Sequence, residues 1–320
     1  MKRILRIFAL TAVLLPALTL PARAARLLVP VGQVIGLKLD SPHITVAAYD
    51  DLLGSCARSA GLKIGDEILS IENTPIHSAE DIRSLLQQHT GPLSMTVRRG
   101  ENQRQLQLTP EQTGDGPRLG VYLRQGIAGI GTVTFYDPQT GLFGTLGHGV
   151  SDAKGNLLQL TQGQAYEASI QSVNRGRSGQ PGQLKGTAAD AFGSLHRNTA
   201  QGVFGQTRRG FPGQCLPVAD YGSIRTGPAA IRCNVTGGTP QEYSVDILKI
   251  YPETRPDGRN FLLKVTDPAL LEATGGIVQG MSGSPIIQDG QLIGAVTHVL
   301  VNDPAMGYGI FIENMLDAAA

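Results

Sequence analysis

Short apolar runs separated by glycine and proline turns recur along this chain and restrict its fold more than any other feature. Glycine accounts for 41 of the 320 residues, well above its usual share of ~7%. Asp289-Gly290 stands between two of the runs and is a strong signal for a two-residue hairpin turn. Many short strands with such turns predict a mainly β protein built as a sandwich or a barrel. The runs in the second half of the chain are 130–136, 231–235, 243–250, 261–265, 284–288 and 292–301.

The charge balance and the N-terminal segment narrow the class of protein. Lys and Arg number 27 against 26 Asp and Glu, so we expect no nucleic-acid partner. Residues 1–24 hold basic residues and no acid, an apolar run over 7–20, and an A-x-A cleavage pattern at 22–24. This predicts an export signal peptide, with an uncleaved membrane anchor as the alternative. In either case the bulk of the chain is expected outside the cytoplasm.

The three cysteines, Cys56, Cys215 and Cys233, match no zinc-site spacing. We interpret them as small core residues, and a disulfide between Cys215 and Cys233 stays open. The sequence shows no metal-ligand cluster and no nucleotide-binding loop, so we expect neither a metal nor a cofactor.

Residues 29–110 have the pattern of one small α+β domain. The run A-G-L-K-I-G-D-E-I-L over 60–69 indicates a turn that leads into a strand. Ser78, with Asp81 three residues later, predicts the start of a helix, because the pair has the spacing of a capping box. This segment resembles a PDZ domain, and residues 111–117 (E-Q-T-G-D-G-P) are expected to be a linker.

The PDZ resemblance implies a site that binds peptides. PDZ domains add an extended peptide as a strand to an exposed sheet edge. By resemblance, the groove lies between the predicted strand over 35–39 and the helix over 80–88. The backbone N–H groups of Ile35, Gly36 and Leu37 are then expected to hold the terminal carboxylate.

The segment G-M-S-G-S-P over residues 280–285 is a candidate for nucleophilic catalysis. A nucleophilic serine needs its hydroxyl on a tight turn, with backbone N–H groups directed at the developing oxyanion. The segment resembles the G-x-S-G-[GS]-P motif of chymotrypsin-like serine proteases. In that geometry Ser282 is the nucleophile and the N–H groups of Gly280 and Ser282 form the oxyanion hole.

The segment G-T-L-G-H-G-V-S-D over 144–152 offers the general base. His148 precedes Ser282 in the chain, which is the order of the chymotrypsin arrangement. His298 follows Ser282 by 16 residues and is a candidate for the substrate pocket or a packed core histidine.

The residues alone do not select the acid that would orient His148. Asp152, Asp190 and Asp267 are all available. Asp267 also fits the start of a short helix, because Asp267-Pro268 and the later Gly275 have the pattern of an N-cap, a first-turn proline and a C-terminal glycine.

The order of these segments, together with the string T-G-G-I-V-Q-G-M-S-G-S-P-I-I-Q-D-G over 274–290, resembles the stage IV sporulation protein B serine peptidase family. The resemblance implies a PDZ domain followed by a chymotrypsin-like double β-barrel peptidase domain over 118–317. It also implies His148 as base, Ser282 as nucleophile and Asp267 as acid, with Asp152 as the alternative acid.

The family resemblance implies an exported, site-specific serine endopeptidase of sporulation signalling in the space between the forespore and mother-cell membranes. Its expected substrate is a membrane-bound regulator of an intramembrane metalloprotease, whose release activates the late mother-cell sigma factor. Self-cleavage in trans, with help from the PDZ domain, is expected too. Two alternatives stay open: a PDZ scaffold with an inactive protease domain, and a general extracytoplasmic quality-control protease.

Overall fold

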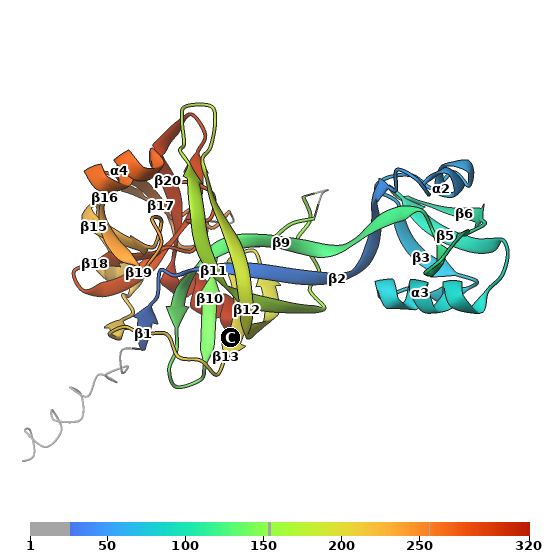
Figure 1. Cartoon of the computed structure of the whole chain (residues 1–320). Helices are drawn as coiled ribbons and strands as arrows, with labels where there is room; N and C mark the ends of the chain where they lie inside the picture. The colour runs from blue at the N-terminus through green and yellow to red at the C-terminus, as the bar shows by residue number, and fades with distance from the viewer. Residues whose placement is uncertain (1–25, 153–154, 256) are drawn as a thin grey trace, which may run out of the picture.

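A computed structural model describes residues 26–152, 155–255 and 257–320. The predicted signal peptide or anchor over 1–24 lies outside these residues. No helix within the described residues is long and apolar enough to cross a membrane. The chain forms two β-barrels and a smaller PDZ body that two long strands connect to the first barrel (Figure 1).

The first barrel has six strands in a closed circuit. Each strand pairs with the next, and the pairing of β2 with both β11 and β9 closes the ring. The inward side chains include the fully buried Phe143 and Val203. In circuit order the strands are β2 (Val34–Tyr49), β9 (Val121–Tyr136), β10 (Leu142–Thr145), β13 (Gly202–Thr207), β12 (Gln183–Thr199) and β11 (Gln162–Asn174).

The second barrel is a closed ring formed by the last third of the chain. The Asp289-Gly290 turn joins two of its strands with both residues at positive φ, as the sequence predicts for a tight hairpin. A short helix, α4 (Pro268–Thr274), precedes the turn that holds Ser282. The ring order is β15 (Gly227–Cys233), β16 (Gln241–Ile250), β17 (Phe261–Val265), β20 (Asp303–Phe311), β19 (Gln291–Leu300) and β18 (Pro285–Gln288).

A shared hydrophobic cluster joins the two barrels. Phe135 and Phe204 from the first barrel pack in one cluster with Leu292 and Ile310 from the second. The C-terminal helix α5 (Ile312–Ala319) adds the buried Met315 to the same cluster. This apolar contact fixes the orientation of the two barrels.

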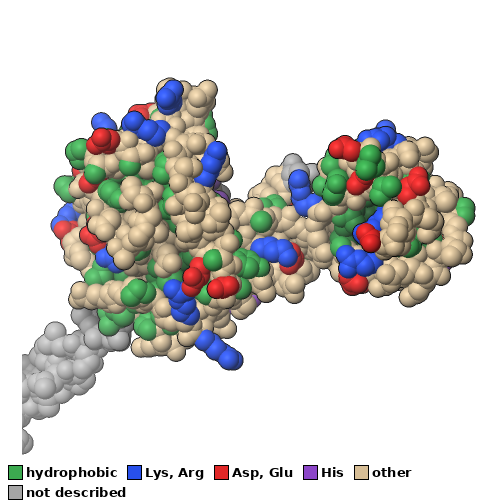
Figure 2. Space-filling model, in the orientation of Figure 1, with side chains coloured by type: hydrophobic (Ala, Val, Ile, Leu, Met, Phe, Trp, Pro, Cys, Tyr) green, Lys and Arg blue, Asp and Glu red, His purple; other side chains and the backbone are tan. Residues whose placement is uncertain are grey.

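The PDZ body is inserted in the chain between β2 and β9, and each of these strands runs through both the first barrel and the PDZ body. The first part of β2 pairs with β11 in the barrel, whereas its later residues Ile44 and Thr45 pair with β3 in the PDZ body. Figure 2 shows the two bodies with a narrower connection, and charges of both signs are scattered over the visible face. The remaining PDZ elements are α2 (Ser55–Ser59), β3 (Glu67–Ile71), β4 (Thr74–Pro75), α3 (Ala79–Gln88), β5 (Leu93–Arg99) and β6 (Asn102–Leu108).

The inserted arrangement corrects the domain boundary predicted at residue 29. Residues before Ser41 belong to the peptidase barrel, because β2 pairs there with β9 and β11 on its two sides. The predicted linker forms a small hairpin of β7 (Glu111–Thr113) and β8 (Gly116–Arg118). The other short elements are β1 (Leu27–Pro30), β14 (Leu216–Pro217) and the 3-10 turn η2 (Tyr221–Ser223).

The local capping signals have the structural consequences that the sequence predicts. Ser78 and Asp81 form a reciprocal capping box at the start of α3. Asp267 caps α4, and Gly275 ends it in the left-handed conformation with φ of 74°. All three cysteines are unpaired, so the disulfide between Cys215 and Cys233 is not formed.

Candidate active site

Ser282 lies on a tight turn between α4 and β18, where the two barrels meet. Its hydroxyl donates a hydrogen bond of 2.7 Å to the carbonyl of Thr297 on β19. Its own carbonyl accepts from the N–H of Thr132 on β9, at 2.9 Å. The neighbouring Gly283 has no room for a side chain, because a Cβ there would lie 2.0 Å from the Thr132 carbonyl oxygen. The serine is therefore held by one strand of each barrel.

The turn leaves backbone donors free beside the serine. Within the described residues, the N–H groups of Gly280 and Ser282 donate no hydrogen bond, whereas those of Met281 and Gly283 do. The Met281 side chain is fully buried and anchors the turn in the second barrel. Two free amides on one turn have the chemistry of an oxyanion hole, and that role for Gly280 and Ser282 stays a prediction.

The tip of the β11–β12 hairpin supports this turn from the first barrel. The N–H of Leu184 donates to the carbonyl of Gln279 at 2.8 Å, and the N–H of Gln279 donates to the carbonyl of Gly182 at 2.9 Å. The Leu184 side chain is fully buried and packs against the position of Gly280. These contacts fix the segment that supplies the first free amide.

His148 follows β10 of the first barrel. Leu146 and Gly147 both have φ of 69°, a left-handed turn that brings Gly147 against the Thr297 side chain. The Nδ1 atom of His148 lies 2.9 Å from the carbonyl oxygen of Gly149. A carbonyl only accepts, so we assign the proton to Nδ1, which leaves Nε2 as the basic nitrogen.

Burial keeps His148 in the basic form. Desolvation lowers its pKa below the ordinary 6.5, and the hydrogen bond to Gly149 offsets part of that effect. A neutral imidazole has the protonation state that a general base requires. Both residues are tied to the same short stretch of β19. Ser282 bonds the Thr297 carbonyl, Gly147 lies against the Thr297 side chain, and the ring of His148 packs near that of His298.

His298 completes the cluster on β19. Its ring centroid lies 5.0 Å from that of His148. Among the described residues, His298 Nδ1 and Thr297 Oγ1 are buried without a hydrogen-bond partner. Burial, His148 and Arg259 lower the pKa of His298 to about 4, against a smaller opposing effect of Asp257. His298 is therefore neutral at neutral pH and lies beside the base.

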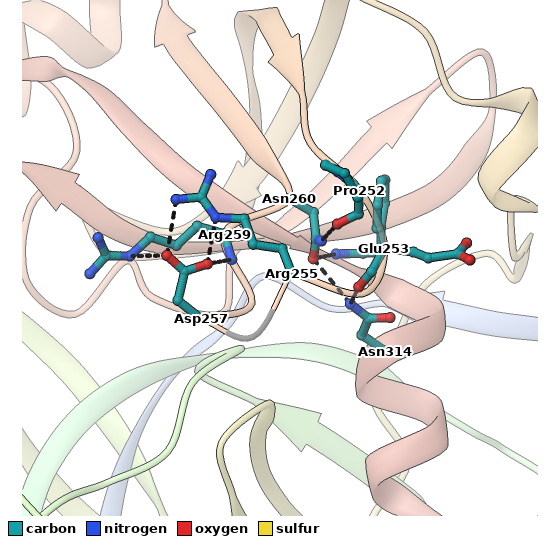
Figure 3. A network of polar contacts seen from close by, with 8 residues as sticks. Pro252, Glu253, Arg255, Asp257, Arg259, Asn260 and Asn314 are labelled. Carbon is teal, nitrogen blue, oxygen red and sulfur yellow. Dashed lines mark hydrogen bonds and ion pairs between the residues drawn. The ribbon is translucent and has the colours of Figure 1, made fainter.

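A polar loop precedes β17, and its charged residues Asp257 and Arg259 interact with His298. Asp257 accepts from Arg255 at 2.7 Å and pairs more loosely with Arg259 (Figure 3). Arg259 lies over the ring of Tyr308, which is the cross-strand partner of His298. Asn260 anchors the loop through hydrogen bonds to the Pro252 carbonyl and to Asn314 of α5.

The two predicted acids accept hydrogen bonds from backbone N–H groups. The Asp267 carboxylate accepts from the N–H groups of Leu270 at 3.0 Å and Ser244 at 3.3 Å. These bonds hold the start of α4 against β16, and the histidine Nδ1 is bonded to Gly149 instead. The structure shows Asp267 as the cap of α4, and its role as the triad acid stays a prediction. The alternative acid, Asp152, accepts from the N–H of Asn156 in its own turn.

The predicted carboxylate-holding residues of the PDZ groove are also placed elsewhere. Ile35, Gly36 and Leu37 are buried in the first barrel and paired on both sides, so no peptide can add to them. Among the described strands of the PDZ body, β6 ends the sheet on one side, and β9 over 121–124 has a second unpaired edge on the side away from β2. Gln125 donates to the carbonyl of His77, just before α3, and accepts from the N–H of Ala79 in its first turn, so this edge faces the start of the helix.

The sequence reasoning missed the groups that position the serine and histidine. No sequence motif marks the Thr297 carbonyl or the Leu184 amide, because every residue has these backbone groups and only the fold brings particular ones to the site. Asn198, which bonds the loop after His148, stands in an unremarkable polar stretch.

The double barrel, with a serine turn and a half-buried histidine where the barrels meet, defines a serine peptidase. The chain belongs to the family described as SpoIVB peptidase S55, which matches residues 115–316, and residues 53–99 match a PDZ domain. It is also 31% identical over 100 residues to a putative zinc metalloprotease, Atu1380, of Agrobacterium fabrum. That match covers 31% of this chain and only 26% of the relative.

Solved structures of the Rv3671c protease of M. tuberculosis are similar to part of the chain. The inactive form shares 15% identity, with a TM-score of 0.34, over 61% of this chain and 85% of that one. The active form shares 16% identity, with a TM-score of 0.35, over 62% of this chain and 75% of that one.

Proposed function

We propose that this chain is an exported endopeptidase that cleaves a membrane-bound regulatory protein at one or a few sites. The observation that supports it most is the placement of Ser282 and His148 around Thr297, with two free amides beside the serine. In the proposed reaction, His148 Nε2 takes the Ser282 proton as the hydroxyl attacks the scissile carbonyl. The amides of Gly280 and Ser282 stabilise the oxyanion, and His148 then protonates the leaving amine.

The proposed physiological role follows from the family. Cleavage of the regulator would release an intramembrane metalloprotease and so activate the late mother-cell sigma factor. The site of action would be the space between the forespore and mother-cell membranes, and the chain would also cleave itself in trans. The N-terminal segment would bring the peptidase close to a membrane.

The PDZ body is proposed to select the protein substrate. The unpaired edge of β9 beside α3 fits an extended peptide that adds as a strand. Leu85, a half-buried side chain of α3, is a suitable position to perturb such a groove. We expect Leu85→Glu to preserve hydrolysis of a short peptide but to slow cleavage of the protein substrate, with the exposed Gln88→Glu as control. Equal loss of both activities would contradict a separate recognition role.

The proposal is tested by sequencing new N-termini in the membrane fraction of cells that produce wild-type protein or Ser282→Ala. A few wild-type-dependent cuts in the extracytoplasmic part of membrane proteins are expected. Cuts spread over many unfolded proteins would instead favour a quality-control protease. If the two samples are identical, a PDZ scaffold with an inactive peptidase domain becomes the better explanation.

A further inference from the structure

Within residues 26–152, 155–255 and 257–320, three buried side-chain polar atoms lack a hydrogen-bond partner, and they lie close to one another. They are Oγ1 of Thr297, Nδ1 of His298 and Nε of Arg259. Thr297 and His298 are consecutive on β19, and Arg259 lies over the ring of Tyr308, the cross-strand partner of His298. Buried polar groups in folded proteins are nearly always hydrogen-bonded. Three exceptions beside the carbonyl that accepts from Ser282 indicate a place where a substrate group supplies the missing partner.

The charge of Arg259 is only loosely matched by its own loop. Arg255 takes both oxygens of the Asp257 carboxylate, at 2.7 and 3.0 Å (Figure 3). Arg259 approaches the same carboxylate only to 4.0 Å, and its side chain donates no hydrogen bond to any described residue. The Glu253 carboxylate, also in this loop, points away from the group in Figure 3. A guanidinium with unused donors is the side chain best suited to bind a carboxylate.

The position of a substrate residue next to His298 follows from the free edge of β19. Among the described strands, β18 pairs with β19 only over 291–295, so the edge of residues 297–300 away from β20 is unpaired. An extended substrate can add there antiparallel, the direction of every pairing in the second barrel. When the residue to be cut lies opposite Thr297, beside the serine hydroxyl, the residue before it lies opposite His298. That is the distance at which cross-strand side chains interact.

We propose that this peptidase prefers substrates with an acidic residue directly before the residue at which it cuts, and that Arg259 and His298 bind its carboxylate. Arg259 supplies the opposite charge, and a neutral imidazole can donate a hydrogen bond from Nδ1. The two side chains are close enough to interact electrostatically, so one carboxylate can reach both. The inference rests on the proposed roles of Ser282 and His148, and it names the substrate class of that site.

The test begins with a proteome-derived peptide library that is cut by the full-length protein, with Ser282→Ala as the blank. Sequencing of the new termini should show Glu or Asp enriched at the position before the cut residue. One cut peptide is then made in two forms, with Glu or with the uncharged Gln at that position. The Gln form should have a kcat/KM lower by roughly 10-fold, about the effect of losing one charge-assisted hydrogen bond.

Variants of the loop assign the preference to its charges. Arg259→Gln should abolish the difference between the two peptides, mainly by slowing cleavage of the Glu form. Asp257→Asn removes the competing carboxylate but keeps the oxygen that accepts from the Arg259 N–H, so it should increase the difference. Arg208→Gln removes an exposed arginine that follows β13 and serves as the charge-matched control, which should behave as the wild type.

Equal cleavage of the two peptides by the wild type, or a difference that a folded Arg259→Gln variant leaves unchanged, would overturn the proposal. If Arg259→Gln does not fold, Asp257→Asn decides, and a difference equal to that of the wild type would overturn the proposal. Absence of any Ser282-dependent cut in the library would refute the proposed peptidase activity instead, so the two failures are distinguishable.

Discussion

Acidification should destabilise this protein through His298, and the His298→Gln variant isolates that effect. Burial beside His148 and Arg259 lowers the pKa of His298 to about 4, whereas an unfolded histidine titrates near 6.5. A group with a lowered folded pKa stabilises the native state above its unfolded pKa. That stabilisation is lost as the pH falls from 6.5 toward 4, because the unfolded chain then binds the proton more readily.

The size of the effect follows from the shift. Each pKa unit corresponds to about 1.4 kcal/mol, which sets an upper limit of roughly 3 kcal/mol for the whole range. His298 is only partly buried, so solvent screening reduces the expected loss between pH 7 and pH 4.5 to about 1–2 kcal/mol.

The assay is urea unfolding of wild-type protein and His298→Gln at these two pH values. The wild-type free energy of unfolding should fall by about 1–2 kcal/mol more than that of the variant. His77→Gln removes an exposed histidine at the start of α3 and serves as the control. Identical pH dependence in the wild type and in His298→Gln would refute the argument from burial.

Three further outcomes test the site. Because burial lowers the pKa of His148, kcat/KM should fall only as the pH drops below 6.5. An acid limb above pH 6.5 in the pH–rate profile would contradict this lowered pKa. Asp267→Asn should retain the cap of α4, because Asn caps a helix as well as Asp does, and should lose roughly 10⁴-fold in kcat if Asp267 orients His148; a kcat within a few-fold of the wild type in steady-state assays would leave Asp267 with the capping role alone. Leu184→Ala should lower the free energy of unfolding in urea by about 2–5 kcal/mol and should lower kcat more than it raises KM. Leu195, a buried leucine of β12 in the first barrel, provides the control. An equal loss of kcat in Leu195→Ala would show that the hairpin tip has no specific role.

The sequence predicts the local elements well where a side chain acts on its own neighbourhood. The capping box at Ser78 and the cap at Asp267 depend on contacts three residues away, and the structure has both. The tight turn at Asp289-Gly290 is equally local.

The sequence does not predict arrangements that depend on long-range pairing. β2 begins in the barrel and ends in the PDZ body. The PDZ resemblance predicts a free edge at Ile35–Leu37, whereas the structure pairs these residues with β9 and β11. The β11–β12 hairpin has irregular register and many exposed small residues, which give no clear alternation along its strands. Its role in holding Gln279 is visible only in three dimensions.

The candidate site shows the same division. Ser282 and His148 stand in glycine-rich segments whose residue types themselves suggest chemistry. Residue type does not select the acid, because Asp-Pro before a short helix gives the same sequence whether the carboxylate caps the helix or orients a histidine. The Gly149 carbonyl and Asn198 could not be chosen from residue type, because any residue has a carbonyl and most asparagines only bind solvent.

The central claim is that Ser282 is a nucleophile activated by His148. It is tested most directly by exposing full-length wild-type protein, Ser282→Ala and His148→Ala to a fluorophosphonate probe and mapping the adduct by peptide mass spectrometry. The account predicts one adduct on Ser282 in the wild type, none in Ser282→Ala, and a strongly reduced yield in His148→Ala. Labelling on another serine, or equal labelling of Ser282 with and without the histidine, would contradict it.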